Sequence, residues 1–235
     1  MSELKLLRKG KTKDVYELSD NLLKLVFTDR VTINEAGQVD PGGNEVSDQQ
    51  LPGTGRACLK MTSLIFKQLA DLGIKTHMVS FDLDKNSMDV KKAAVLGNGL
   101  EWVARWVGTG SFVRRYKSLA CVKDGMRFPS LITEITLKDD AGGDPMIDQS
   151  SIVALGLLTE KEMQDTQKAN LAVMKSLHDM FKERGLDLWD IKVEWGRDSE
   201  SGQIILIDEV SPNSCRAYDL QSGKKIEGRE LAERF

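Results

Sequence analysis

Residues 186–195, Leu-Asp-Leu-Trp-Asp-Ile-Lys-Val-Glu-Trp, constrain the fold of this chain more than any other segment. Side chains alternate between the two faces of a strand, so Asp190, Lys192 and Glu194 share one face. The opposite face takes the large apolar side chains, Trp189, Ile191, Val193 and Trp195. A second apolar run, residues 203–210, follows a polar turn, as in an antiparallel hairpin. The pattern therefore predicts a strand with one charged face, which suits either a solvated surface or a functional site.

The remaining segments predict an α+β fold in which antiparallel sheets combine with separated helices. An N-terminal hairpin is indicated by two apolar runs on either side of Ser19-Asp20-Asn21. Apolar side chains recur at helical spacing in two segments, the second of which begins with a capping box formed by Thr159 and Glu162. Gly97-Asn98-Gly99 has the composition of a hairpin turn. The expected strands are 15–18, 22–27, 76–83, 88–96, 100–107, 131–137, 186–195 and 203–210, and the expected helices are 57–72 and 159–184.

Composition excludes several classes of protein. The chain has 235 residues, 40% of them hydrophobic, and a formal net charge of −3, which argues against a nucleic-acid partner. It contains no apolar run of about 18 residues, so we expect no membrane partner. Residues 1–5 lack the apolar stretch of a signal peptide, and the three cysteines form no CxxC pair, so we expect a cytoplasmic protein with ordinary buried thiols. Only two histidines are present, so any metal should be held by oxygen ligands.

Residues 34–56 show no periodicity and contain five glycines and two prolines. Loops of roughly 20 residues are uncommon inside compact domains and are often binding loops or lids, or else disordered. We expect a loop that is mobile without ligand and closes over bound substrate.

Two carboxylates are candidates for a metal site. Asp208 follows an apolar run that is typical of a covered strand, and a buried carboxylate needs a cationic partner. Either a lysine or a divalent cation would provide one. Glu194 and Asp208 could share a magnesium ion, which favours a few carboxylates together with substrate phosphates. The register of the hairpin decides whether these two side chains meet.

Three further segments contain groups suited to anions. Arg216 follows the acidic strand end after a short turn, where its guanidinium could bind a phosphate or carboxylate, or form a surface salt bridge. Arg105 precedes a Gly-Thr-Gly turn and Ser111, where the start of a helix would expose free N–H groups, although a simple turn explains the pattern equally well. Residues 10–13, Gly-Lys-Thr-Lys, suit either a loop over a triphosphate or a solvated basic turn. The Walker A, Gly-x-Gly-x-x-Gly and protein-kinase signatures are absent.

Taken together and in this order, these segments resemble one family, the phosphoribosylaminoimidazole-succinocarboxamide (SAICAR) synthetases of purine biosynthesis. The resemblance covers roughly residues 5–219, and its last two motifs are the most specific. The matching stretches are 10–16 (GKTKDVY), 105–115 (RWVGTGSFVRR), 138–140 with 143–145 (KDD and GDP), 190–194 (DIKVE) and 208–216 (DEVSPNSCR).

The resemblance implies an ATP-dependent ligase that joins L-aspartate to carboxyaminoimidazole ribotide, with ATP and Mg²⁺ as cofactors. It implies two lobes around an ATP cleft, distantly similar to ATP-grasp enzymes and protein kinases, and often assembled as a homo-oligomer. We expect the N-terminal lobe at 1–104 and the C-terminal lobe at 105–235.

The resemblance also implies residue roles. Lys192, Glu194 and Asp208 would be catalytic, and Glu194 and Asp208 would hold the metal. The ATP-binding residues would be Lys11, Thr12, Lys13, Val15 and Lys192, and the substrate-binding residues would be Arg105, Ser111, Asp190 and Arg216.

Two alternatives stay open at this point. A paralogue could keep the ATP chemistry and join a different amine or carboxylate. A nucleotide-binding module could lack catalysis, although intact Lys192, Glu194 and Asp208 argue against it.

Overall fold

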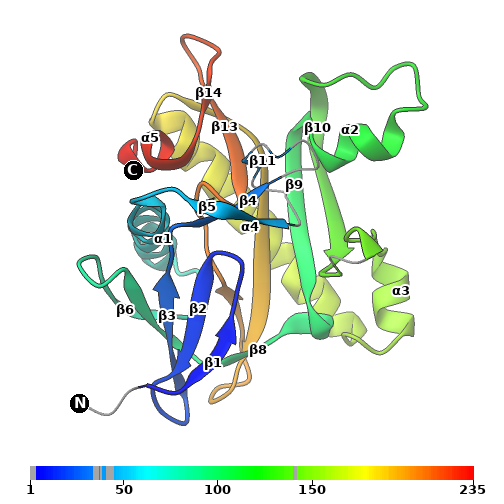
Figure 1. The fold of residues 1–235 in the computed structure, drawn as a ribbon. Coiled ribbons are helices and arrows are strands. Elements are labelled where there is room, and N and C mark those ends of the chain that lie inside the picture. The colour runs from blue at the N-terminus through cyan, green and yellow to red at the C-terminus, as the bar shows by residue number, and fades with distance from the viewer. Residues whose placement is uncertain (1–3, 34–36, 38, 41–44, 140–141) are drawn as a thin grey trace.

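The computed structural model describes residues 4–33, 37, 39–40, 45–139 and 142–235. Two large antiparallel sheets carry the fold, and helices pack against them (Figure 1). This arrangement confirms the predicted α+β class with antiparallel sheets. In the part of the chain that is described, no helix combines the length and the apolar character needed to cross a membrane.

The first sheet has the strand order β1-β2-β3-β7-β6. The predicted N-terminal hairpin is confirmed, since β2 pairs with β3 from Lys13 opposite Phe27 to Glu17 opposite Leu23. The tight turn between β1 and β2 carries residues 10–12. The strands are β1 (Leu6–Lys9), β2 (Lys13–Glu17), β3 (Leu22–Phe27), β6 (Met78–Asp82) and β7 (Ser87–Lys91).

The second sheet is built around the long strand β11 (Leu186–Asp198). Strand β11 pairs with β9 and β8 along one edge and with β13 and β12 along the other. The predicted hairpin of 186–195 with 203–210 is confirmed, although the second strand ends at Ile207. The other strands are β8 (Ala93–Val95), β9 (Leu100–Gly108), β10 (Met126–Leu137), β12 (Ile204–Ile207), β13 (Cys215–Asp219) and β14 (Lys225–Ile226).

Two sequence predictions in this sheet are wrong. Gly97-Asn98-Gly99 does not close a hairpin: it belongs to a 3₁₀ turn, η1 (Leu96–Asn98), between β8 and β9, which pair one after the other with β11. Trp189 does not share the core face of β11, because an irregularity between Leu188 and Asp190 shifts the alternation. Its indole instead stacks on Tyr218 at 3.7 Å between ring centroids.

The two long predicted helices are confirmed with small shifts of their ends. Helix α1 (Thr54–Asp71) is followed by Gly73 in the left-handed conformation, which suits a C-terminal cap. In α4 (Glu160–Glu183), Thr159 and Glu162 form the predicted capping box. Ser111 begins α2, as the Gly-Thr-Gly turn suggested. The shorter helices are α2 (Ser111–Tyr116), α3 (Gln149–Ala154) and α5 (Gly228–Glu233).

Helix α1 joins the two sheets into one structure. Met61, Ile65 and Phe66 enter the main core, which also contains the buried faces of α4 and β11. Cys58 and Leu59 of the same helix enter a smaller core with β3 and β7. One helix therefore buries apolar surface against both sheets, which fixes their relative position.

The prediction of a structureless loop over 34–56 is wrong for its second half. Residues 45–50 form β5 (Glu45–Gln50), which pairs with β4 (Arg30–Ile33), and α1 begins at Thr54. Residues 34–36, 38 and 41–44 lie outside the described part of the chain, so the expected closure of this loop stays a prediction. Cys58 and Cys215 are buried as expected, whereas Cys121 is exposed.

The expected lobe boundary between residues 104 and 105 falls within β9, which lies entirely in the second sheet. The division of the chain into lobes at that residue stays a prediction.

Candidate active site

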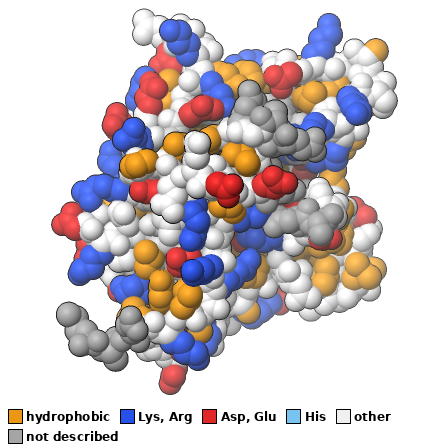
Figure 2. All heavy atoms as spheres, in the orientation of Figure 1, with side chains coloured by type: hydrophobic (Ala, Val, Ile, Leu, Met, Phe, Trp, Pro, Cys, Tyr) orange, Lys and Arg blue, Asp and Glu red, His pale blue; other side chains and the backbone are white. Residues whose placement is uncertain are grey.

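A cleft of about 680 Å³ lies between the two sheets and is lined by residues of both. Ten lysines and arginines line it against six aspartates and glutamates, although the whole chain carries a net charge of −3. Figure 2 shows Lys and Arg side chains near the middle of one face of the molecule. The local excess of positive charge suits an anionic ligand.

The turn between β1 and β2 is held by hydrogen bonds to its backbone. The Gly10 amide donates to the Lys13 carbonyl at 2.8 Å, and a Cβ on Gly10 would lie 2.6 Å from that oxygen, so only glycine fits. Arg30 donates to the carbonyls of Gly10 and Lys11, and the Thr28 hydroxyl donates to Thr12. The carbonyls of residues 10–12 therefore all accept hydrogen bonds.

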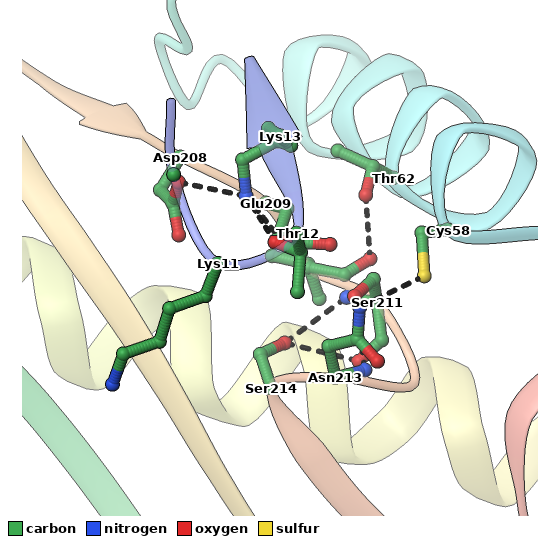
Figure 3. Close-up of polar contacts among 12 residues, drawn as sticks. Lys11, Thr12, Lys13, Cys58, Thr62, Asp208, Glu209, Ser211, Asn213 and Ser214 are labelled. Carbon is green, nitrogen blue, oxygen red and sulfur yellow. Dashed lines mark hydrogen bonds and ion pairs between the residues drawn. The ribbon is translucent and has the colours of Figure 1, made fainter. Parts of the chain in front are cut away.

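Lys13 and Thr12 contact the two acidic residues that follow β12, Asp208 and Glu209 (Figure 3). The Lys13 Nζ lies 3.0 Å from Asp208 Oδ1 and also forms a short ion pair with Glu209. The Thr12 hydroxyl donates to Glu209 Oε1 at 3.0 Å. Burial would lower the pKa of Lys13, but Asp208 and Glu209 outweigh it and raise the pKa. Lys13 thus stays charged, while the side chain of Lys11 points away from this cluster in Figure 3.

Four charges alternate around a ring in the sheet. Glu194 of β11 lies opposite Glu101 of β9 in the register, and two lysines separate these like charges. Lys192 Nζ is 2.5 Å from Glu101 and 3.6 Å from Glu194. Lys138 Nζ is 2.6 Å from Glu194 and 3.9 Å from Glu101. We call these four residues the charge ring.

Asp208 adds a third carboxylate beside the charge ring. Burial and Asp208 raise the pKa of Glu194, against the opposing effect of Lys192 and Lys138. Burial also acts to raise the pKa of Asp208, but Lys13, Lys138 and Lys192 outweigh it and hold that pKa well below its usual range. The two carboxylates predicted to share a metal therefore lie close enough to influence each other's ionisation.

The residues present fit a divalent cation that keeps part of its shell for water and phosphate. Within the described residues, no three acidic, histidine or cysteine side chains converge to form a complete protein cage. Glu194 and Asp208 offer two carboxylates beside three lysines, and Mg²⁺ is commonly held by one or two carboxylates plus substrate phosphates. The donor set thus suits magnesium delivered with a nucleotide.

A second cluster surrounds Asp190 at another part of the cleft. Arg105 is 3% exposed and donates to Asp190 at 2.8 Å, to Glu134 at 2.8 Å and to the Ser111 hydroxyl at 2.9 Å. Arg216 donates from Nη1 to Asp190 at 2.8 Å. The donors of Arg105 are thus engaged within the protein, which favours a role in holding Asp190 and Ser111 in place.

Arg216 packs directly against a glycine. Its Nη2 donates to Asp40 at 2.7 Å, and Gly110, at φ 56°, leaves room for the guanidinium. A Cβ on Gly110 would lie 2.9 Å from Nη2, so a side chain there would displace the arginine.

The turn before Arg216 is fixed by its own side chains. The Ser211 amide donates to the Ser214 hydroxyl, which in turn donates to the Ser211 carbonyl, each at 3.0 Å. The Asn213 side-chain amide contacts Cys58 Sγ at 3.2 Å (Figure 3). These bonds present Arg216 from a rigid turn.

All residues predicted for the site line this one cleft: Lys11, Thr12, Lys13, Val15, Arg105, Ser111, Asp190, Lys192, Glu194, Asp208 and Arg216. Sequence reasoning missed Glu101 and Glu209 as site residues and assigned no role to Lys138 or His77. The signal for Glu101 was available, because strand alternation places it on the face of Arg105.

Comparisons with known proteins agree with this geometry. A family model for SAICAR synthetase matches residues 6–231. The chain is 40% identical over 223 residues to the phosphoribosylaminoimidazole-succinocarboxamide synthase of Clostridium tetani, covering 95% of each chain. The fold is similar to the crystal structure of the Ehrlichia chaffeensis synthase, with a TM-score of 0.82, 27% identity and coverage of 95% and 89% of the two chains.

A solved SAICAR synthetase in complex with ADP is similarly close, with a TM-score of 0.81, 29% identity and coverage of 94% of this chain and 87% of that one. The fold and its cleft are those of a purine-biosynthetic ligase. This chain belongs to the SAICAR synthetase family.

Proposed function

We propose that this protein catalyses the ATP-dependent ligation of L-aspartate to carboxyaminoimidazole ribotide, yielding SAICAR, ADP and phosphate. The observation that carries the proposal is the family match over residues 6–231, together with a cationic cleft that contains every expected site residue. A cytoplasmic location and assembly as a homo-oligomer stay predictions.

The chemistry requires activation of a carboxylate, which is a poor acyl donor. An oxygen of the ribotide carboxylate forms a bond to the γ-phosphorus of ATP, and ADP leaves. The amino nitrogen of aspartate then forms the amide bond, and phosphate leaves. Catalysis of this kind depends mainly on alignment and on charge neutralisation.

Two groups of cleft residues bind the two nucleotides: one group binds ATP and the other binds the ribotide. Lys11, Thr12 and Lys13 bind the triphosphate, and Val15 contacts the nucleotide base or sugar from β2. A magnesium ion held by Glu194 and Asp208 would neutralise phosphate charge. Lys192 faces the transferred phosphoryl group from the charge ring.

The Asp190 cluster binds the ribotide. Asp190 and Asp40 each accept one N–H of the Arg216 guanidinium, and the other N–H groups of its terminal nitrogens suit the phosphate or carboxylate of that substrate. Ser111 contributes a hydroxyl and a backbone amide at the start of α2. Arg105 supports ribotide binding indirectly, because it holds Asp190 and Ser111 in place.

An ADP-release assay with substrate omission tests the function. We expect ADP only when ATP, Mg²⁺, the ribotide and L-aspartate are all present, and SAICAR as the second product. ADP release with another amine or carboxylate in place of these substrates would identify a paralogue. Binding of ATP without any turnover would identify a nucleotide-binding module.

A further inference from the structure

Asp208 has an unusual backbone conformation at the point where β12 ends. Its φ is 65°, and the other three non-glycine residues with positive φ among those described are Asn86, Asn98 and Asp144. The left-handed conformation is unfavourable for an L-residue because it brings the Cβ close to the following carbonyl oxygen. Such a residue persists only where its surroundings hold it there. The conformation ends the strand and turns the Asp208 side chain toward Lys13.

His77 contacts the peptide unit of this strained residue. Its Nε2 lies 3.2 Å from the Asp208 carbonyl oxygen. Because a carbonyl can only accept a hydrogen bond, Nε2 carries the proton and donates. The imidazole is 5% exposed and meets the Phe66 ring edge to face, so water does not replace this donor.

The backbone of His77 is anchored to both sheets. Its amide donates to the Leu206 carbonyl of β12 at 2.9 Å, and its carbonyl accepts from the Lys91 amide at the end of β7 at 2.8 Å. Thr76, its neighbour, forms a parallel bridge with Leu206. The imidazole is therefore held at a fixed position relative to the last residues of β12, where the chain passes from one sheet toward the cleft.

We propose that His77 is a positioning residue that holds the Asp208 peptide in its left-handed conformation and thereby aims the Asp208 carboxylate at the cation site. This inference rests on the proposed function, because it takes Asp208 as a ligand of the divalent cation. His77 does not touch the reacting atoms. Its contribution is to maintain a conformation that the Asp208 residue alone would leave.

The test compares two amide variants of His77 in the full chain. In His77→Gln the side-chain amide nitrogen occupies the position of Nε2, whereas in His77→Asn the shorter side chain brings it only to the position of Nδ1. Both variants bury one amide, so a purely structural role would lower the melting temperature of both by a similar amount. His77→Phe keeps the ring and its contact with Phe66 but removes the donor.

The readout is binding of Mn²⁺, a paramagnetic substitute for Mg²⁺, to the protein saturated with ADP, measured by electron paramagnetic resonance. We expect the Mn²⁺ dissociation constant to rise about tenfold in His77→Asn and His77→Phe, the loss of one hydrogen bond of about 1.4 kcal/mol. His77→Gln should stay within about threefold of the wild type, and ADP affinity measured in EDTA should be equal in all folded variants.

Asp208→Asn separates the two levels of the inference. If Asp208→Asn binds Mn²⁺ as tightly as the wild type, the proposed metal role of Asp208 is wrong. If Asp208→Asn loses the ion but His77→Asn and His77→Gln bind it equally, the positioning role of His77 is refuted while the proposed function stands. The Gln and Asn variants decide the matter even if His77→Phe does not fold.

Discussion

The charge ring makes a specific prediction about Glu101, a residue of the cleft to which the proposed function assigns no substrate. Replacing it with glutamine keeps the shape of the side chain and removes its charge. Lys192 then loses the carboxylate at 2.5 Å, and both lysines of the ring compete for Glu194. We expect Lys192 to shift toward Glu194, away from the position in which the proposed function has it face the transferred phosphoryl group.

The size of the effect follows from the contacts of Lys192. The loss of a hydrogen bond to a charged group costs about 1.5–3 kcal/mol. The Lys192 side chain is 33% exposed and keeps Glu194 at 3.6 Å, so solvent screening and the remaining partner favour the lower half of that range, about 1.5–2 kcal/mol. That free energy corresponds to a loss of about 10- to 30-fold in kcat/KM for ATP.

Steady-state ADP release at saturating ribotide and aspartate measures this loss. Asp198→Asn is the matched control, because Asp198 is also buried on β11 and pairs with Lys91 at 3.1 Å, but does not line the cleft. This control should melt at a lower temperature and keep its kcat/KM. The reasoning is refuted if Glu101→Gln stays within about twofold of the wild type, or if Asp198→Asn loses as much activity.

Three other predictions concern Arg216, Gly110 and His77. Arg216→Lys keeps the charge but loses the paired donors, so kcat/KM for the ribotide should fall by a factor that corresponds to roughly 1.5–3 kcal/mol, while kcat/KM for ATP changes much less. Equal losses would show that Arg216 does not discriminate between the substrates. Gly110→Ala should raise KM for the ribotide, because its Cβ would lie 2.9 Å from the arginine, and an unchanged KM would contradict that steric argument. Burial lowers the pKa of His77 from 6.5 to about 4; Asp208 opposes this shift and Lys13 adds to it. The buried neutral imidazole therefore contributes its full stabilisation above pH 6.5, and that stabilisation is lost as the pH falls toward 4, because the unfolded chain takes up the proton first. Urea denaturation should therefore show a decrease of about 3 kcal/mol in the free energy of unfolding over that interval that is absent from His77→Gln, and parallel pH profiles would contradict the assignment.

Local patterns in the sequence determine much of this fold. The apolar spacing of α1 and α4, the capping box at Thr159 and the N-terminal hairpin depend on neighbours within a few residues, so the chain itself carries their signals. Alternation along β11 likewise predicted that Asp190, Lys192 and Glu194 share one face. The resemblance to the family predicted that the same residues belong to one site.

Where a signal depended on pairing, the sequence was insufficient. Gly97-Asn98-Gly99 has hairpin composition, yet the strands on either side of it both pair with β11 instead of with each other. Residues 45–50 have no periodicity of their own and become a strand only because β4 lies beside them. Trp189 leaves the core face because a local irregularity shifts the alternation of β11, and alternation alone does not reveal such a shift.

The partners of the site charges were decided by the tertiary structure. Arg105 was expected to bind substrate, and folding surrounds its guanidinium with Asp190, Glu134 and Ser111. Glu101 and Lys192 are 91 residues apart in the chain, and His77 lies 131 residues from Asp208. The sequence specified which charges the chain carries and which strand faces they occupy. Strand pairing within the second sheet brought Glu101 to Lys192, and the packing of the two sheets brought Lys13 to Asp208, because contacts between distant segments depend on the register and position of whole elements.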